Sequence, residues 1–228
     1  MVLADIKAIG LDRDGTVLDN MIQRAEAFAE AVIQYYPGLA SEKDAIIISV
    51  LQTRGVCRFD HLEFLINKYG LPALLEEQKI AWSQLFEEFY RVKPVDIFAE
   101  VVPVLQRLKG DYHLFLSTSA TDGMHPKHLK ILGPLFRNGN QSFMFENKPG
   151  FKKGRDHFEY VAGELGIALE QMAFIGDSPL DIRLANECGL YSVGIIDNRY
   201  GDDAKEVMLA ENPRLYIYSL DELFREGF

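Results

Sequence analysis

The sequence predicts an α/β protein: a doubly wound, Rossmann-like parallel sheet with an all-helical domain inserted near its beginning. A short buried strand near the N-terminus is followed by a long stretch of helical periodicity, and after residue 94 strands and helices alternate. The length of 228 residues allows one main domain with a second domain inserted in it. We expect a core of residues 1–18 and 95–228 and a helical cap domain of residues 19–94, with hinges near Asp19-Asn20 and Lys93-Pro94.

The first strand and the cap come from the N-terminal part of the chain. Residues 7–11 form a short apolar run that ends at Asp12, which is typical of a buried strand. From about residue 21 to residue 92, apolar side chains recur at helical spacing on one face and then on another: Ala25, Phe28, Ala29, Val32 and Ile33, then Leu62, Leu65, Ile66 and Tyr69. Pro37-Gly38 and Gly70 with Pro72 predict the ends of two of these helices.

The rest of the chain predicts the remaining strands and the helices that cover them. Strands are expected at residues 114–116, 143–145, 172–175, 191–196 and 215–218, and helices around residues 101–108, 155–165, 180–187 and 203–209. Ligands of such sheets bind beyond the carboxyl ends of the strands. The candidate functional residues should therefore follow the strands.

Composition and charge exclude several classes of protein. The net charge of −10 and the pI near 5.0 argue against a nucleic-acid surface, and a small anion would need a metal ion or a local basic pocket. No apolar run approaches the roughly 18 residues of a membrane helix, and the N-terminus does not resemble a secretory signal, so a cytoplasmic protein without membrane contacts is expected. Cys57 and Cys188 lie far apart and predict neither a disulfide framework nor a zinc site.

The most informative segment is Asp12-Arg13-Asp14-Gly15-Thr16, where the first strand ends. An isolated Asp-x-Asp-Gly also fits an ordinary turn, because Asp-Gly is common turn chemistry. Polar residues at other strand ends favour a functional interpretation.

A second pair of carboxylates, Asp177 and Asp181, follows the strand at residues 172–175. Ser178 is expected to cap a helix that begins at Pro179, with Asp181 complementing the helix dipole. Nothing in this account requires Asp177. Asp12 and Asp177 at neighbouring strand ends would offer the oxygen ligands that Mg²⁺ favours.

Two weaker signals complete the set. Ser117-Thr118 offers hydroxyls after the strand at residues 114–116, and three lysines precede the next helix: Lys148, Lys152 and Lys153. Each of these residues would also fit a solvated surface.

In their order along the chain, these segments resemble the four motifs of the haloacid dehalogenase superfamily of phosphohydrolases. The insert is similar to the C1 cap of its phosphoglycolate phosphatase and β-phosphoglucomutase branch. The resemblance covers nearly the whole chain, and its first and fourth motifs are specific. In relatives the motif lysine often stands 25 residues before the metal-binding Asp, and this spacing selects Lys152 over Lys148 and Lys153.

The resemblance implies a role for each residue. Asp12 would be the nucleophile, and Asp14 the general acid and base. Mg²⁺ would be bound by the side chains of Asp12 and Asp177 and by the main-chain carbonyl of Asp14. Asp181 would contact these ligands without binding the ion itself. Ser117 would bind the phosphoryl group and Lys152 would hold the nucleophile and the phosphate. Gly15 and Thr118 would also contact the substrate, and the choice between Ser117 and Thr118 as the phosphate-binding hydroxyl stays open.

The implied activity is Mg²⁺-dependent hydrolysis of a small phosphorylated metabolite through an aspartyl-phosphate, in a monomer or a dimer. The alternatives are a phosphomutase of the β-phosphoglucomutase type, a phospho-receiver module and a catalytically silent binding module. Arg13 departs from the branch, because Asp-Arg-Asp-Gly-Thr resembles histidinol-phosphatase-type members, which lack a large cap and often bind zinc through cysteines.

The turn around Gly55 in the cap brings two arginines together, Arg54 and Arg58. It is similar to the substrate loop of β-phosphoglucomutase-like caps. Both side chains could equally be solvated, with Arg58 paired to Asp60 or Glu63. In a chain of net charge −10, this local basic site suits a second anionic group of the substrate.

Overall fold

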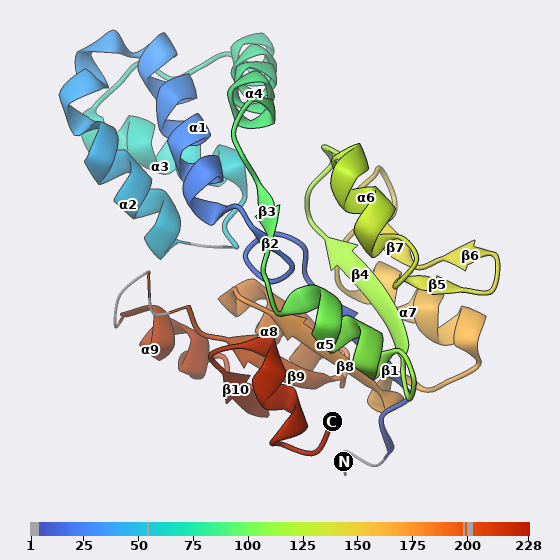
Figure 1. The fold of residues 1–228 in the computed structure, drawn as a ribbon. Coiled ribbons are helices and arrows are strands. Elements are labelled where there is room, and N and C mark those ends of the chain that lie inside the picture. Colours follow the sequence, from blue (N-terminus) through green and yellow to red (C-terminus); the bar gives the residue numbers. More distant parts are fainter. Residues whose placement is uncertain (1–4, 54, 198, 200–202) are drawn as a thin grey trace. The chain divides into compact units, whose positions relative to one another are not determined.

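The computed structural model describes residues 5–53, 55–197, 199 and 203–228 (Figure 1). It divides into two compact units, a core of Met1–Asp19 and Asp96–Phe228 and a cap of Asn20–Val95. Each boundary lies one residue from the predicted position. Across the ranges given above, no helix has the length and apolarity needed to cross a membrane.

The core contains a six-stranded sheet in which every neighbouring pair is parallel. The spatial order is β10-β9-β8-β1-β4-β7. The strands are β1 (Ala8–Leu11), β4 (His113–Thr118), β7 (Met144–Glu146), β8 (Met172–Gly176), β9 (Tyr191–Ile195) and β10 (Leu215–Ile217). This arrangement confirms the predicted parallel sheet, and it places β1 between β4 and β8.

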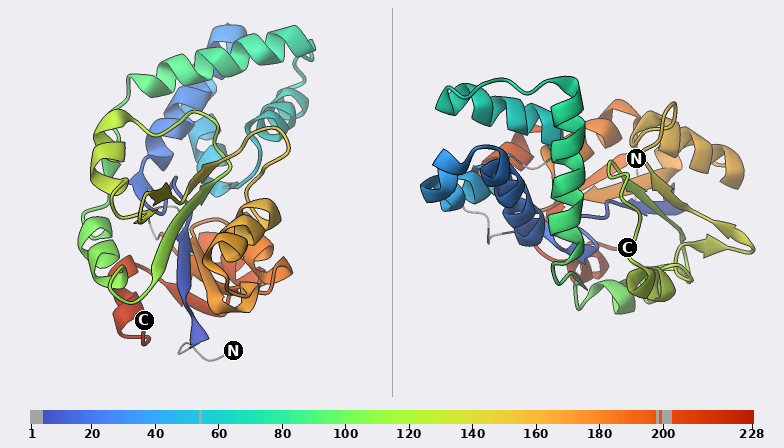
Figure 2. Two further views of the ribbon diagram at one scale, coloured as in Figure 1. Left: turned by 90° about the vertical axis from the view of Figure 1, so that its right-hand side faces the viewer. Right: turned by 90° about the horizontal axis from the view of Figure 1, so that it is seen from above.

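Helices cover both faces of the sheet (Figure 2). They are α5 (Val101–Leu108), α6 (Pro126–Leu132), α7 (Arg155–Leu165), α8 (Pro179–Glu187) and α9 (Asp203–Ala210), with short 3-10 helices at Leu169–Gln171 and Leu220–Phe224. The apolar spacing of α5 explains its packing, because Val101, Val104, Leu105 and Leu108 recur every three or four residues and are all buried. Helix α6 was not predicted from the sequence.

Two short antiparallel pairs complete the core. Strands β2 (Leu18–Asp19) and β3 (Asp96–Ile97) pair where the chain leaves the core and returns to it, with Asp19 opposite Asp96. Strands β5 (Arg137–Asn138) and β6 (Gln141–Ser142) form a small hairpin.

Aromatic side chains fill one face of the sheet. Phe158 of α7 lies 4.9 Å from Phe174 of β8 and 6.1 Å from Phe115 of β4, measured between ring centroids. All three are buried. Burial of each ring contributes roughly 1.5–3 kcal/mol, so this cluster holds α7 firmly against the sheet.

The cap has a hydrophobic core of its own. Its elements are α1 (Met21–Tyr35), a 3-10 helix (Pro37–Glu42), α2 (Lys43–Gln52), α3 (Arg58–Tyr69) and α4 (Glu76–Arg91). Trp82 is fully buried, and its ring meets Phe28 edge to face at 5.1 Å. The predicted helix ends are confirmed, since α1 ends at Tyr35 and Gly70 terminates α3 in the left-handed conformation, with φ +61°.

Candidate active site

The ends of three neighbouring strands bring the predicted motifs to one edge of the sheet. Leu11 of β1 is in register with Leu116 of β4 and with Ile175 of β8. The Asp12 amide then donates to the Ile175 carbonyl at 2.8 Å. The residues at the ends of these strands therefore lie side by side, as the sequence predicts: Asp12, Ser117 and the residues after β8.

The main chain turns sharply after Asp12. The amides of Val17 and Leu18 both donate to the Arg13 carbonyl, at 3.0 and 2.8 Å, and the Gly15 amide donates to the Leu18 carbonyl at 2.9 Å. Gly15 has φ +81°, a left-handed conformation that a side chain would strain. The glycine of the motif therefore forms the turn that presents Asp12 and Asp14 beyond the strand.

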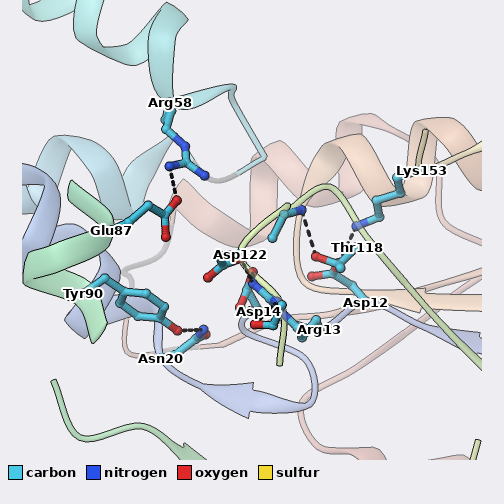
Figure 3. A network of polar contacts seen from close by, with 12 residues as sticks. Asp12, Arg13, Asp14, Asn20, Arg58, Glu87, Tyr90, Thr118, Asp122 and Lys153 are labelled. Carbon is cyan, nitrogen blue, oxygen red and sulfur yellow. Dashed lines mark hydrogen bonds and ion pairs between the residues drawn. The ribbon is translucent and has the colours of Figure 1, made fainter. Parts of the chain in front are cut away.

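The lysine beside Asp12 is Lys153, and the prediction of Lys152 is wrong on this point. The Lys153 ammonium lies 2.5 Å from Oδ1 of Asp12 (Figure 3). It also lies 2.5 Å from Oδ1 of Asp181. Lys152 is exposed, and its amide donates to Asp156. Sequence spacing cannot distinguish two adjacent lysines, because the backbone decides which side chain reaches Asp12. Just after Lys153 the backbone turns at Gly154, whose φ is +101°.

Asp181 is held in place by the start of α8. Its Oδ2 accepts hydrogen bonds from the Ser178 amide at 3.1 Å and the Ser178 hydroxyl at 2.7 Å. The Asp181 amide donates to Ser178 Oγ at 3.3 Å, which confirms the predicted cap. A Cβ at Gly176 would lie 2.4 Å from this carboxyl group, so only glycine permits the approach. The Asp181 carboxylate thus bonds to Lys153 and to Ser178, which suits the supporting role expected of it.

A buried acidic cluster lies at the same edge of the sheet. Asp12, Asp177 and Asp181 each offer a carboxylate oxygen within 4.8 Å of the others. Burial raises the pKa of Asp12 to about 7, with Lys153 opposing this effect and Asp181 and Asp14 adding to it. Burial by itself would lower the pKa of Lys153, but the carboxylates of Asp12 and Asp181 raise it above the ordinary value, which keeps the ammonium charged.

The donor set fits a hard divalent cation. Carboxylate oxygens are the ligands that Mg²⁺ prefers, and three buried carboxylates with one ammonium leave excess negative charge. A cation bound there would also favour the ionised form of Asp12 over the protonated form.

Arg13, which the sequence showed only as a departure from the family pattern, forms a buried network. It is 1% exposed, and its guanidinium makes two bonds to the Asp14 carboxylate, Nε to Oδ1 at 3.1 Å and a terminal nitrogen to Oδ2 at 3.0 Å. It also bonds to Asp122 at 2.6 Å and to the Gly123 carbonyl at 3.2 Å (Figure 3). Burial acts to lower the pKa of Arg13, but Asp14 and Asp122 raise it, so the charge is retained.

Sequence reasoning missed Asp122 because nothing in a loop sequence marks an acid 109 positions away from its partner. The only available signal was Arg13 itself, since a buried guanidinium requires a carboxylate partner.

The two candidate hydroxyls at the end of β4 have different partners. Ser117 is fully buried, and its Oγ lies 2.8 Å from Nδ1 of His157 on α7. Thr118 is 1% exposed and accepts a hydrogen bond from the Ala120 amide at 3.1 Å. His157 was not predicted as part of the site, because one buried histidine on an apolar helix face has no sequence signal of its own.

The cap arginines are only partly described. Arg54 lies outside the residues that the structure describes. Arg58 begins α3 and pairs with Glu87 of α4, rather than with Asp60 or Glu63, and it also donates to the Ser83 hydroxyl at 3.3 Å (Figure 3). Its positive charge is therefore offset within the cap.

Comparisons with known proteins identify relatives of the chain. The chain is 26% identical to the phosphoglycolate phosphatase of Shigella boydii, over 96% of this chain and 91% of that protein. Its fold is similar to a haloacid dehalogenase-like hydrolase from Streptococcus pneumoniae, with a TM-score of 0.74, 19% identity, and 99% and 100% of the two chains covered.

A hydrolase of the same family from Deinococcus radiodurans, solved with bound phosphate and sodium, has a TM-score of 0.68 and 17% identity, with 96% of this chain and 94% of that chain covered. Residues 6–189 match the family model of the haloacid dehalogenase-like hydrolases. The chain therefore belongs to the haloacid dehalogenase-like hydrolase family.

Proposed function

We propose that the protein is a Mg²⁺-dependent phosphatase that hydrolyses a small phosphomonoester through an aspartyl-phosphate on Asp12. The contact between Lys153 and Asp12, beside the buried carboxylates of Asp177 and Asp181, carries the proposal. The relatives named as phosphoglycolate phosphatases support the same reaction class.

A carboxylate is a weak nucleophile toward a phosphate ester, because both groups are negatively charged. In the proposed reaction, Asp12 attacks phosphorus and the ester oxygen leaves. Lys153, whose ammonium touches Asp12, reduces the charge repulsion and orients the attacking oxygen. Ser117 is positioned at the neighbouring strand end to donate to a phosphoryl oxygen.

Mg²⁺ would be held by the side chains of Asp12 and Asp177 and the main-chain carbonyl of Asp14, and when bound it supplies positive charge that offsets the phosphoryl oxygens. Asp181 keeps Lys153 and the start of α8 in place without itself being required as a ligand.

Asp14 is assigned as the general acid and base. It protonates the leaving oxygen in the first step and takes a proton from the attacking water in the second. Arg13 holds both oxygens of this carboxylate near the first motif, so one oxygen must exchange its bond to Arg13 for a proton before Asp14 acts as the acid. A hydrolase is favoured over a phospho-receiver, because such modules have about half this length. Asp60 is the acid that would have to serve as the phosphoacceptor of a receiver, and it lies in helix α3 instead of following a strand.

The test is turnover of para-nitrophenyl phosphate with Mg²⁺, followed by a panel of phosphorylated metabolites that begins with phosphoglycolate. We expect Asp12→Asn and chelation of the metal to abolish activity and Asp14→Asn nearly to do so. Asp111→Asn, at an exposed position of the core, is the matched control and should remain active. Activity that survives Asp12→Asn would contradict the proposal.

Product analysis separates the alternatives. Free phosphate from a sugar phosphate indicates a hydrolase, and an isomeric sugar phosphate indicates a mutase. An acyl-phosphate that persists for many minutes after treatment with acetyl phosphate would instead indicate a receiver module.

A further inference from the structure

His157, the buried partner of Ser117, has no role in the function proposed so far. Both side chains are fully buried, and the distance of 2.8 Å between Ser117 Oγ and His157 Nδ1 is that of a good hydrogen bond. Ser117 is the residue after the register pair Leu11 and Leu116, so it stands level with Asp12.

The segment that leads into α7 connects this pair to the nucleophile. Lys153, which contacts Asp12, precedes His157 by four residues. His157 is enclosed by the rings of Phe151, with centroids 4.5 Å apart, and Phe145, at 5.6 Å. The imidazole is therefore held tightly, on the same stretch of chain that supplies the lysine.

Hydrogen-bond chemistry limits how this pair can bind a phosphoryl group. Every phosphoryl oxygen is an acceptor, so a serine that binds one must give its single hydroxyl hydrogen to it. Ser117 can do so only if its own oxygen accepts from the imidazole instead of donating to it. In the described part of the chain, His157 Nε2 makes no hydrogen bond of good geometry, although the Phe151 backbone interacts with the ring. A buried acceptor without a good partner is more readily tolerated than a buried N–H without one.

We propose that His157 is a positioning residue whose Nδ1–H donates to Ser117 and thereby directs the Ser117 hydroxyl hydrogen toward a phosphoryl oxygen. This inference rests on the proposed function, because it assigns Ser117 to the phosphate. It also explains why a histidine is buried in an aromatic environment four residues after Lys153.

The first test is the protonation of the ring in the wild-type protein. The protein is labelled with ¹⁵N-histidine, and long-range nitrogen–proton correlation spectra are recorded at neutral pH. They should show that His157 is protonated at Nδ1 and unprotonated at Nε2. A signal from the opposite tautomer would overturn the inference. This measurement requires neither a variant nor activity.

The second test uses His157→Leu, which removes the bond, and His157→Asn, which places an amide nitrogen near the position of Nδ1. We expect His157→Leu to lower kcat for para-nitrophenyl phosphate and to weaken inhibition by inorganic phosphate, each by about ten-fold, and His157→Asn to recover much of the loss. Phe158→Leu, which removes packing from the same helix, is the matched control and should retain kcat while it lowers Tm.

Coupling to Ser117 completes the test. The Ser117→Ala/His157→Leu double variant should lose no more activity than Ser117→Ala alone, because the histidine acts only through the serine. Losses that multiply, or a His157→Leu variant with full kcat, would overturn the inference. A wild-type protein that hydrolyses no phosphomonoester would contradict the proposed function, whereas the tautomer and the binding of inorganic phosphate would still test His157.

Discussion

Arg13 and Asp14 are neighbours in the chain, and the Arg13 guanidinium nevertheless turns back to hold both oxygens of the Asp14 carboxylate. The same guanidinium reaches Asp122, so a single buried side chain joins the first motif to the loop after β4.

Loss of the Arg13 charge should reduce both stability and activity. Arg13→Met leaves Asp14 and Asp122 without this partner, and removing one member of a buried ion pair costs about 3–5 kcal/mol. Differential scanning calorimetry should show Tm lower by roughly 6–20 °C, and kcat should fall because Asp14 is no longer oriented. Arg137→Met, at an exposed position, is the control. An Arg13→Met protein with unchanged Tm and kcat would show that the network has no role.

The adjacent lysines should differ sharply in activity. Lys153→Met removes the ammonium that contacts Asp12 and Asp181, and kcat for para-nitrophenyl phosphate should fall by about a hundred-fold or more. Lys152→Met changes an exposed side chain and should leave kcat within about two-fold. The reverse result would restore the assignment made from the 25-residue spacing.

The cap arginines should affect specificity and not the chemical step. Arg54→Ala should raise KM by about ten-fold, roughly 1.4 kcal/mol, for a substrate with a second anionic group. Turnover of para-nitrophenyl phosphate should stay nearly unchanged. Arg58→Ala should have a smaller effect on KM, because Glu87 already offsets its charge. Equal losses on both substrates would indicate that this loop does not contact the substrate.

The buried His157 should make the protein less stable in mild acid than it would be without this histidine. Burial lowers the pKa of His157 to about 4 from the ordinary 6.5, so between these values the unfolded chain binds a proton that the folded protein does not. The contribution of His157 to the free energy of unfolding is therefore greatest above pH 6.5 and decreases as pH falls toward 4, by up to about 3 kcal/mol. Asp12, whose pKa burial raises to about 7, acts in the opposite direction over the same range, so the effect of His157 is the difference between wild type and a variant without it.

Urea denaturation from pH 7.5 to 4.5 measures this change. The stability of His157→Leu relative to the wild type should increase as pH falls from 6.5 toward 4.5, whereas that of His113→Gln, at an exposed histidine, should not. Parallel pH profiles for wild type and His157→Leu would contradict the assignment.

The strands and most helices were predictable because buried strands appear in the sequence as short apolar runs and buried helix faces as apolar residues at helical spacing. The apolar run before Asp12 became β1, and α7 begins and ends at the predicted residues. Helix α6 was missed although His125 caps it and Pro126 opens it, because a seven-residue helix shows too little periodicity. The two-residue strand pairs β2–β3 and β5–β6 were missed because pairs so short carry no alternation.

The candidate site was predictable where the residues themselves follow strands, as Asp12 and Asp177 do. It was not predictable where the decisive contact depends on side-chain direction. Lys152 and Lys153 are identical in type and adjacent, and only the folded backbone distinguishes them. The partners of Arg13 and Ser117 come from distant segments, and sequence spacing has no information about such contacts.

The pairing of Asp19 with Asp96 means that the chain departs from the core and re-enters it at adjacent positions. For the sheet, the whole helical insert is thus equivalent to a hairpin loop, and the strand order does not depend on what that loop contains. The entropy of closing a loop grows only slowly with its length. The strand order of the core therefore places few limits on the length or the sequence of the cap.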